Sequence, residues 1–412
     1  MKKILIYGMG KTGKELARFC TKRKIPFSTF DDNRNKPEEF QKNLRNCNRI
    51  IVSPGVGLRN ENIKKAIKAK IKVISEIEFA AEFISKPLIA ITGTNGKTTT
   101  ALLTYDLLKS SGLKVFLGGN IGTPLIKAAE DDSKYDLILI ETSSFQLQFI
   151  DSKFHPNVSV LLNISENHLD HHLSMKEYVA SKKKVFKNST ITDYAIIDSS
   201  AILNTRIKGT VIDPLKSKEI YTTNDKIIIK GMEIIKKEIK LIGPHNIKNI
   251  LFSLNIFSLF KEVTNKQLEI IQKFSPPIHR LERIGTNREI INDSKSTSPQ
   301  ATEVAIESFK KNIVLIMGGK DKKLDYSSLL APIRKKVVLL ILFGENKFEL
   351  AKVFDKNKIY LAPNLYEAVR KGLKESNKKG PLIFSPGTSS FDQFNSYSQR
   401  GEVFKKYVKE LS

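Results

Sequence analysis

The sequence predicts an α/β protein of three successive domains, each built around a mostly parallel sheet. Three observations lead to this prediction. The chain has 412 residues, which is too long for one typical hydrophobic core. Short apolar runs alternate with helical patterns along its length, and glycine-rich turns follow several of these runs. We expect domains at residues 1–86, 87–276 and 277–412, with the first boundary at Lys86-Pro87.

The first domain is predicted from a repeated strand–helix pattern. KILIY ends at a glycine turn, a helix through KELARFCTKRK follows, and PFSTF gives the second strand. RIIVSPGVG and KVISEIEFAAEF continue the pattern, so we expect a small parallel sheet covered by helices. The first apolar segment is only about four residues long, whereas the core of a signal peptide needs about 7–15. This favours a first strand in a cytoplasmic protein.

The central domain begins with the strand PLIAIT, turns at GTNG and enters a helix at KTTTALLTYDLLKSSG. YDLILIE and NVSVLLNIS are predicted as further buried strands, and residues 190–242 become rich in strand patterns. A helix over GPHNIKNILFSLNIFSLF precedes SPPIHRLERI, where the third domain begins. That domain has predicted strands near NIVLIMGG, VVLLILFG and PLIFSPG, with helices between them.

Composition excludes several classes of protein. The formal net charge is +26, but the lysines are spread over the whole chain and no RNA-binding pattern with interleaved aromatic residues is present. We therefore expect no nucleic-acid partner, although an anionic substrate gains from the positive field. The longest apolar run, VVLLILF, is far below the roughly 20 residues of a membrane span. Two cysteines provide neither a disulfide framework nor a metal cluster.

The stretch ITGTNGKTTT predicts a phosphate-binding turn with unusual spacing. The pattern G-x-x-x-x-G-K-[ST] requires a glycine five positions before Gly96, where Ile91 stands, so a loop that starts at Gly93 is two residues short. Its context of strand, turn and helix is nevertheless the one that a phosphate loop needs. Lys97 would add positive charge at the β- and γ-phosphates, and Thr98 a hydroxyl ligand for Mg²⁺. Taken alone, the residues also fit an ordinary turn with a solvated lysine.

Two further features support a nucleotide site. Glu141 ends the buried strand YDLILIE, the position at which open α/β sheets place their chemistry, and a carboxylate there suits a Mg²⁺ that bridges phosphates. NISENHLDHH brings together His168, Asp170, His171 and His172. Because no cysteine or H-E-x-x-H pattern supports zinc, we expect one of these histidines on a second Mg²⁺.

The N-terminal GMGKTG matches G-x-G-x-x-G after a strand, and Asp31 and Asp32 follow about 20 residues later. This pattern predicts a Rossmann-like domain and makes an NAD-dependent enzyme a rival interpretation. Against it, no domain with a hydride-transfer constellation is visible, and the phosphate loop would be left unexplained.

Eight motifs occur in the order of the Mur ligases, a family that this chain resembles: GTNGKTT, GGNIGTP, ETSSFQL, NISENHLDHH, GPHNIKN, HRLE, NDSKSTSPQAT and SPGTSSFDQF. The resemblance runs from the first strand to Arg400 or beyond. The short phosphate loop is the one that this family uses, and it implies a central P-loop ATPase-like domain followed by a C-terminal Rossmann-like domain. The last two motifs resemble the D-glutamate-adding branch, since the branches that add L-alanine or a diamino acid have a Tyr-Ala-His-type stretch at the first of these motifs.

The resemblance implies an ATP-dependent ligase that joins D-glutamate to UDP-N-acetylmuramoyl-L-alanine in peptidoglycan precursor synthesis. The reaction would pass through an acyl phosphate and a tetrahedral intermediate. The implied cofactors are two Mg²⁺ ions and a CO₂-derived carbamate on a lysine of EYVASKKKVF. That lysine aligns as Lys182, with Lys183 and Lys184 as alternatives if the alignment slips. We expect the enzyme to work as a monomer.

The resemblance also assigns site residues. The implied catalytic residues are Lys97, Glu141, His168 and Lys182, and Thr98 joins Glu141, His168 and Lys182 as metal ligands. The implied ATP-binding residues are Gly93, Thr94, Asn95, Gly96, Lys97, Thr98, Thr99, Asn249, Arg280 (preceded by His279) and Asp293. The implied UDP-substrate residues are Lys11, Thr12, Asp31, Asp32, Ser53, Gly55 and Asn120. The implied D-glutamate residues are Lys295, Thr297, Lys322, Ser390 and Phe391.

Three other functions compete with this interpretation. A relative of folylpolyglutamate synthase would share the phosphate loop and the modified lysine, but an 86-residue Rossmann-like domain suits a UDP-sugar and has no obvious use with folate. A basic, nucleotide-dependent RNA-binding protein would show salt-sensitive retention on RNA without turnover. An inactive ligase is the third alternative, although Lys97, Glu141, His168 and Lys182 are all intact.

Overall fold

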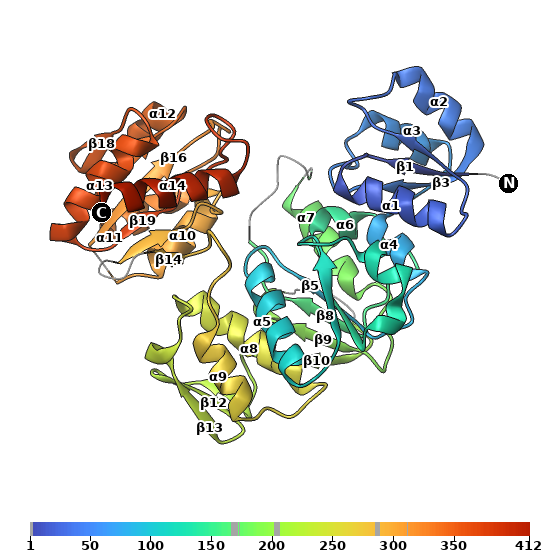
Figure 1. Cartoon of the computed structure of the whole chain (residues 1–412), viewed down its shortest axis with the longest axis horizontal. Coiled ribbons are helices and arrows are strands. Elements are labelled where there is room, and N and C mark those ends of the chain that lie inside the picture. Colours follow the sequence, from blue (N-terminus) through green and yellow to red (C-terminus); the bar gives the residue numbers. More distant parts are fainter. Residues whose placement is uncertain (1–2, 166–171, 173, 202–206, 285–288, 311) are drawn as a thin grey trace. The chain divides into compact units, whose positions relative to one another are not determined.

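The structure, a computed structural model, describes residues 3–165, 172, 174–201, 207–284, 289–310 and 312–412. It divides into two compact units, residues 1–236 with 248–272, and residues 237–247 with 273–412. Within the described ranges the first unit carries a four-stranded, a six-stranded and a three-stranded sheet, and the second unit a six-stranded sheet (Figure 1). The predicted α/β class is confirmed. The three predicted domain ranges stay a prediction, because the first unit contains the first and most of the second.

The N-terminal sheet is wholly parallel, with the strand order β2-β1-β3-β4. Alternate residues of its strands pack on opposite faces: Ile4, Ile6 and Ile51 lie with helices α1 and α4, whereas Leu5 and Tyr7 lie with α2 and α3 (Figure 1). Its elements are β1 (Lys3–Tyr7), α1 (Lys11–Lys22), β2 (Phe27–Phe30), α2 (Pro37–Asn46), β3 (Cys47–Val52), α3 (Glu61–Lys68), β4 (Lys72–Ser75) and α4 (Glu76–Ala81).

The central sheet is also parallel, with the order β10-β9-β8-β5-β7-β6. Strands β5, β7 and β8 are buried on both faces, which explains why they are continuous apolar runs in the sequence. Its elements are β5 (Leu88–Thr92), α5 (Lys97–Ser110), β6 (Val115–Gly119), η1 (Leu125–Glu130), η2 (Asp132–Lys134), β7 (Leu137–Glu141), α6 (Ser144–Gln148), β8 (Val158–Leu161), α7 (Met175–Lys183), η3 (Lys184–Phe186), β9 (Tyr194–Ile197), η4 (Ser199–Ala201) and β10 (Thr210–Ile212).

A small antiparallel sheet and two helices follow. The predicted strand-rich character of residues 190–242 is confirmed by β9 to β13, and the helix predicted after GPHN is α8. These elements are β11 (Ile220–Thr222), β12 (Lys226–Ile229), β13 (Met232–Ile235), η5 (Lys236–Glu238), α8 (Pro244–Ser258) and α9 (Asn265–Lys273). Among the described residues, no helix is both long and apolar enough to cross a bilayer.

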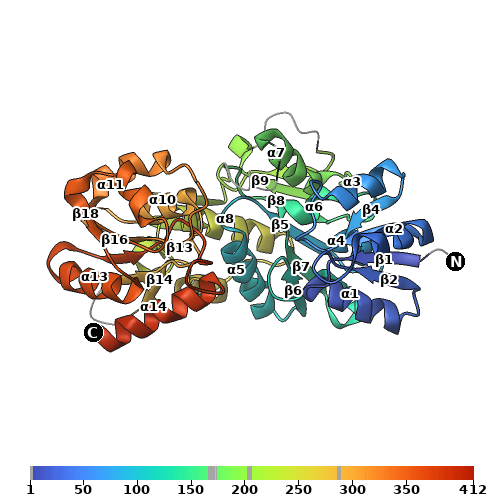
Figure 2. The ribbon, with the colours of Figure 1, turned by 90° about the horizontal axis from the view of Figure 1, so that it is seen from above.

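The second unit has a sheet of order β14-β15-β19-β16-β17-β18, parallel except for the pair β14–β15. Helices α10 and α11 cover one face, and α13 and α14 cover the other (Figure 2). The elements are β14 (Glu282–Ile284), β15 (Ile290–Asn292), α10 (Pro299–Glu307), β16 (Ile313–Gly318), η6 (Ser327–Leu329), α11 (Leu330–Lys336), β17 (Val337–Phe343), α12 (Lys347–Val353), η7 (Lys356–Lys358), β18 (Ile359–Leu361), α13 (Leu365–Lys379), β19 (Leu382–Phe384) and α14 (Tyr397–Leu411).

Candidate active site

The predicted phosphate loop joins β5 to α5, and glycine is required at its end. Gly96 caps α5 with a φ of +86°, a left-handed conformation that side chains with a Cβ rarely adopt. A Cβ at this position would also lie 2.3 Å from Oδ1 of Asn249. The loop therefore turns into the helix at Gly96 itself, with the predicted ATP-binding residue Asn249 packed against it.

The segment after β8 braces this loop. The backbone N–H of Thr94 donates to the carbonyl of Asn163 (3.0 Å), and that of Asn95 donates to the Asn163 side-chain oxygen (2.9 Å). The Asn163 amide donates back to the Asn95 carbonyl (3.0 Å), and the Thr94 hydroxyl lies 3.0 Å from the Tyr178 hydroxyl. Asn163 was not among the predicted residues. Asn163 lies just after a buried strand, at the same sheet edge as the loop, and this position in the sequence could have predicted it as a site residue.

Side chains from three strand ends meet beside the loop. The Lys97 ammonium donates to the carbonyls of Gly93 and Thr94, both at 2.9 Å. The buried carboxylate of Glu141, which is 2% exposed, accepts from the Thr98 hydroxyl (2.8 Å) and from the Asn120 amide (2.7 Å). A carboxylate and a hydroxyl are hard oxygen donors of the kind that Mg²⁺ prefers. The structure thus brings together four residues that the sequence assigned to phosphate, metal and substrate.

Lys182 enters the same cluster from α7. Its ammonium is 2% exposed and donates to the Gly93 carbonyl at 2.8 Å, so Gly93 accepts from both Lys182 and Lys97. Burial lowers the pKa of Lys182 well below its usual value, the nearby Lys97 lowers it further, and Glu141 opposes the shift. The neighbouring Lys184 instead donates to the Gln148 carbonyl. Of Lys182 and Lys184, Lys182 is therefore the one that faces the phosphate loop.

The predicted histidine ligand, His168, lies outside the described residues. Among the residues that the structure does describe, no group of three or more His, Cys, Asp or Glu side chains is placed to hold a metal ion. Of the predicted metal ligands, Thr98 and Glu141 lie together and Lys182 is close enough to them for its pKa to respond to Glu141. His172 from the same motif is buried, with Nε2 2.9 Å from the Ser144 hydroxyl, and it packs against Tyr178.

The predicted UDP-substrate residues of the N-terminal sheet lie around the glycine-rich turn after β1. Lys11 and Thr12 open α1, and a Cβ at Gly13 would lie 2.0 Å from the Gly8 carbonyl oxygen, so the helix approaches the turn as closely as glycine allows. The Ser53 hydroxyl, from the turn after β3, donates to the same Gly8 carbonyl at 2.6 Å. Lys11, Thr12 and Ser53 thus lie at one edge of this sheet, whereas Asn120, which was predicted for the same site, lies after β6 in the central sheet.

Both aspartates of this site brace loops of the same domain. Asp31 accepts from the N–H of Met9 (2.6 Å) and of Asn33 (3.0 Å), and these bonds lower the pKa of its carboxyl. Asp32 accepts from the buried Tyr7 hydroxyl at 2.7 Å. Burial raises the pKa of Tyr7 to about 12, and the carboxylate of Asp32 adds to this rise. The predicted contact of Asp31 or Asp32 with uracil or ribose stays a prediction.

In the second unit, the predicted D-glutamate residues lie on loops after β15, β16 and β19. Lys295 and Thr297 follow β15, with the Lys295 ammonium 5.1 Å from the ring centre of Tyr397. Lys322 lies on the loop after β16 and is exposed. Beyond β19, Ser390 is buried, whereas the Phe391 ring is 70% exposed. All three loops leave the carboxyl edge of the parallel part of the sheet, where such sheets bind ligands.

Asp293 lies beneath these loops. Its buried carboxylate accepts from the hydroxyls of Ser296 (2.5 Å) and Ser385 (2.8 Å) and from the Leu281 N–H (3.2 Å). Burial raises the pKa of Asp293 to about 6 against these bonds. Its predicted contact with ribose stays a prediction, and this geometry favours a role in holding two loops together.

Arg280 and its neighbour His279 have different surroundings. Burial lowers the pKa of His245 to about 4, and the charge of Arg280 contributes to this decrease. The same charge opposes the rise in the pKa of Asp293. His279 has a φ of +65°, and its buried ring Nδ1 lies 2.9 Å from the Asn292 amide. His279 is thus packed against the end of β15.

Arg400, on α14, is a residue that the sequence did not assign to the site. Its guanidinium is fully buried and donates to the Ser294 hydroxyl (3.1 Å), the Ser294 carbonyl (2.8 Å) and the Thr388 carbonyl (3.1 Å). Burial lowers the pKa of Arg400 to about 9. One planar side chain therefore joins the loops that carry Lys295 and Ser390.

Replacing Arg400 by lysine is expected to destabilise the second unit by about 2 kcal/mol, because an ammonium cannot reproduce the planar fork that holds both loops. Urea unfolding would measure this loss. Arg370→Lys is the matched control, since Arg370 contacts only Glu367 on an exposed helix face in the described structure. Equal stability of the two variants would contradict the role of Arg400.

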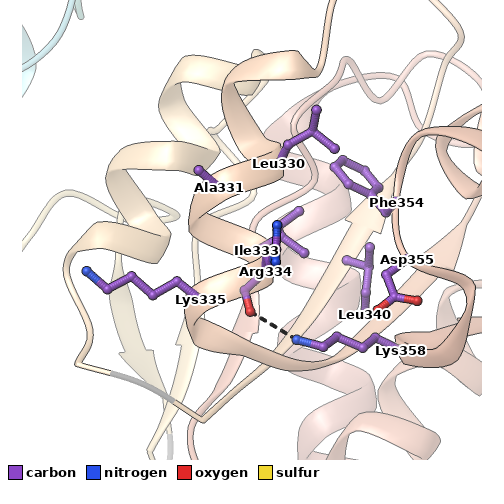
Figure 3. Close-up of a pocket in the computed structure, with 9 residues that line it drawn as sticks. All are labelled: Leu330, Ala331, Ile333, Arg334, Lys335, Leu340, Phe354, Asp355 and Lys358. Atoms are coloured by element: carbon purple, nitrogen blue, oxygen red, sulfur yellow. Dashed lines mark hydrogen bonds between the residues drawn. The ribbon is translucent and has the colours of Figure 1, made fainter.

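A cavity of about 930 Å³ lies elsewhere in the second unit (Figure 3). Its lining comes from α11, β17 and the segment before β18: Leu330, Ala331, Ile333, Arg334, Lys335, Leu340, Phe354, Asp355 and Lys358. Lys358 bridges its wall by donating to the carbonyls of Arg334 and Val337, both at 3.1 Å. Most of these residues precede their strands, so the cavity lies toward the amino edge of the sheet. None of the predicted site residues lines it.

Comparison with known proteins identifies the family. Residues 91–257 match the Mur ligase middle domain, and residues 279–387 match the Mur ligase, glutamate ligase domain. A protein of Geotalea uraniireducens (strain Rf4) named UDP-N-acetylmuramoylalanine--D-glutamate ligase is 35% identical, over 100% of this chain and 98% of that relative. The chain belongs to the Mur ligase family. The predicted family is thereby confirmed, and the NAD-dependent interpretation loses its support.

Solved structures with the fold of this Mur ligase include an ADP complex of MurF ligase from Thermotoga maritima, with 18% identity, a TM-score of 0.61 and coverage of 91% of this chain and 92% of that chain. Mycobacterium tuberculosis folylpolyglutamate synthase complexed with ADP is also similar, with 13% identity, a TM-score of 0.59 and coverage of 84% and 97%. At these identities the likeness shows the fold alone. The full-length relative therefore separates the two ligase interpretations, and the fold does not.

Proposed function

We propose that this Mur ligase adds D-glutamate to UDP-N-acetylmuramoyl-L-alanine with conversion of ATP to ADP and phosphate, in peptidoglycan precursor synthesis. Relatives named UDP-N-acetylmuramoylalanine--D-glutamate ligase, about one-third identical over nearly the whole chain, support these substrates. The observation that carries the chemistry is the cluster in which Lys97, Thr98, Glu141 and Lys182 converge on one phosphate loop. We expect a cytoplasmic enzyme that acts as a monomer.

The first step transfers the γ-phosphoryl group of ATP to the carboxylate of the L-alanyl substrate. Lys97 and the N–H groups at the start of α5 hold phosphate oxygens and offset their charge. Asn120, which is bonded to Glu141, lies where the substrate carboxylate approaches. The three N–H donors of the Lys97 ammonium would be shared between the phosphate oxygens and the Gly93 and Thr94 carbonyls.

The residues present fit a divalent metal and a carbamate. Thr98 and Glu141 would hold Mg²⁺, which supplies charge stabilisation for the transferred phosphoryl group. A lysine reacts with CO₂ only as the neutral amine, and the lowered pKa of Lys182 favours that form. The carbamate would turn a cation beside Lys97 into an anionic ligand next to the metal residues. His168 remains the proposed ligand of the second Mg²⁺.

The second step is attack of the D-glutamate amine on the acyl phosphate, with loss of phosphate from the tetrahedral intermediate. Lys295, Thr297 and Lys322 are proposed to bind the carboxylates of D-glutamate, together with Ser390 and Phe391. The cation Lys322 is exposed on its loop and so accessible to an anionic substrate. Arg400 fixes the two other loops relative to each other.

Phosphate release from ATP, with each component omitted in turn, tests the function. Release should require Mg²⁺, UDP-N-acetylmuramoyl-L-alanine and D-glutamate together, and mass spectrometry should show the amide product. Release only with another amino acid would keep the family and overturn the proposed substrate. Absence of release under every combination would contradict the activity, and salt-sensitive retention on RNA would then favour a binding protein.

A further inference from the structure

Helix α1, which begins at the predicted diphosphate turn, is bound along the segment between β6 and η2. The Lys11 ammonium at its first residue donates to the carbonyl of Gly122. One and a half to two turns further, Arg18 pairs with Glu130. Near the end of the helix, the Arg23 guanidinium donates to the Ala129 carbonyl at 3.2 Å. Three cationic side chains therefore hold α1, along its whole length, against residues 122–130.

The start of that segment is fixed to the catalytic strand. The Asn120 N–H donates to the Glu141 carbonyl at 2.8 Å, and its side-chain amide donates to the Glu141 carboxylate at 2.7 Å. The Gly119 N–H donates to the Thr123 carbonyl at 2.8 Å, which closes the turn on itself. A Cβ at Gly119 would lie 2.3 Å from the Glu141 carbonyl oxygen, so the turn packs directly on the end of β7. Residues 119–123 thus form a short link with little room to move.

We infer that Lys11 is a positioning residue that sets the spacing between the two ends of the UDP-linked substrate. This inference rests on the proposed function, in which the diphosphate binds at the start of α1 and the reacting carboxylate lies near Asn120 and Glu141. An ammonium has three donors. Lys11 can therefore hold the Gly122 carbonyl while another of its N–H groups binds the diphosphate. Both ends of the substrate are then positioned by residues 119–123.

The chain offers a matched control for this role. Lys14 lies one helical turn beyond Lys11 and is also exposed, and no ion pair of its side chain is seen in the described structure. Lys11→Met and Lys14→Met remove the same charge from the same helix. Only the first removes the bond to Gly122. Lys11→Arg keeps the charge and a donor, so it should restore most of the lost function.

Hydrogen exchange and kinetics together test the inference. In the ligand-free full-length protein, Lys11→Met should speed amide exchange in residues 119–123 at least fivefold, whereas Lys14→Met should change it less than twofold. Lys11→Met should also lower kcat/KM for the UDP-linked substrate about tenfold, which is the lower end of the cost of losing a charged hydrogen bond. Part of this loss should fall on kcat, because the reacting end of the substrate is misplaced.

Two results would overturn the inference. A loss confined to KM, with unchanged exchange, would make Lys11 a diphosphate ligand only. Equal effects of Lys11→Met and Lys14→Met would reduce its role to general charge. If the wild-type protein has no ligase activity, the proposed function fails, and the exchange comparison still decides whether Lys11 holds the link in place.

Discussion

Replacing Lys182 by alanine is expected to lower the rate of ligation by about 10²–10³-fold, and a short carboxylic acid such as acetate or formate should restore part of it. The loss follows from removing an anionic group beside the metal residues Thr98 and Glu141, where preorganised charge has its largest effect on rate. The rescue follows from geometry. Truncation opens space next to the Gly93 carbonyl, and a small carboxylate there replaces the oxygens of the carbamate.

Lys184, two positions further along the chain, provides the control for this experiment. Lys184 is also partly buried, and burial and the charge of Lys187 lower its pKa, but its ammonium donates to the Gln148 carbonyl, away from the phosphate loop. Lys184→Ala should therefore lose little activity and should not respond to acetate. A ¹³C NMR signal from labelled bicarbonate, present in the wild type and absent from Lys182→Ala, would identify the carbamate directly. Rescue of Lys184→Ala in place of Lys182→Ala would move the modification by two positions.

The local parts of this site were predictable because they depend on short stretches of sequence. The strands PLIAIT and YDLILIE are buried on both faces, so each is a continuous apolar run that ends where its polar residue begins. A strand, a glycine turn and a helix place Lys97 and Thr98 without knowledge of the rest of the fold. The edge position of Glu141 followed from the rule that parallel strands carry their chemistry at their carboxyl ends.

The contacts that assemble the site were less accessible, because they join residues far apart in the chain. Lys182 meets Gly93 across 89 positions and Arg400 meets Ser294 across 106, and neither separation has a periodicity that a pattern could reveal. That Lys182 and not Lys184 reaches the phosphate loop depends on the register of α7 against the loop, which no short pattern gives. Short strands such as β6 and β18 went unnoticed because their apolar runs are brief and their burial is partial.

Acidic residues show the same limit. Asp31 and Asp293 were predicted as ligand contacts from motif position alone, yet both carboxylates accept hydrogen bonds from neighbouring loops. An aspartate in a turn can serve a ligand, a loop or both, and the type of residue does not distinguish these uses. Glu76 drew no prediction at all, although the structure buries its carboxyl between α4 and η1.

Replacing Glu76 by glutamine is expected to stabilise the protein by about 3 kcal/mol at pH 8 and to have little effect at pH 4.5. The Glu76 carboxyl lies between α4 and η1, where it is 1% exposed and, among the described residues, accepts only from the Ile126 N–H, at 2.6 Å. Its other oxygen has no hydrogen-bond partner in the described structure. Burial without a balancing charge raises the pKa of Glu76 from 4.5 to about 7.

The direction of the effect follows from proton linkage. Between pH 4.5 and 7 the folded protein holds a proton on Glu76 that the unfolded chain has released, so stability falls as the pH rises through this window. A difference of 2.5 between the two values corresponds to about 3 kcal/mol once both states are ionised. Glutamine stays neutral at every pH and keeps an oxygen for the Ile126 N–H. The variant should therefore lose the part of the pH dependence that Glu76 supplies.

Glu78 gives the opposing control in the same contact. Its carboxylate accepts from the N–H groups of Ser152 (2.9 Å), Lys153 (2.8 Å) and Phe154 (2.9 Å), so its charge is matched by three donors. Glu78→Gln places an amide N–H₂ against those donors and should destabilise the protein at pH 8. Urea midpoints at pH 4.5 and pH 8 for the wild type and both variants measure the two effects. Parallel pH profiles of stability for the wild type and Glu76→Gln would show that ionisation of Glu76 does not destabilise the folded protein. Stabilisation by Glu78→Gln would contradict the distinction between the two carboxylates, which rests on the number of hydrogen-bond donors around each.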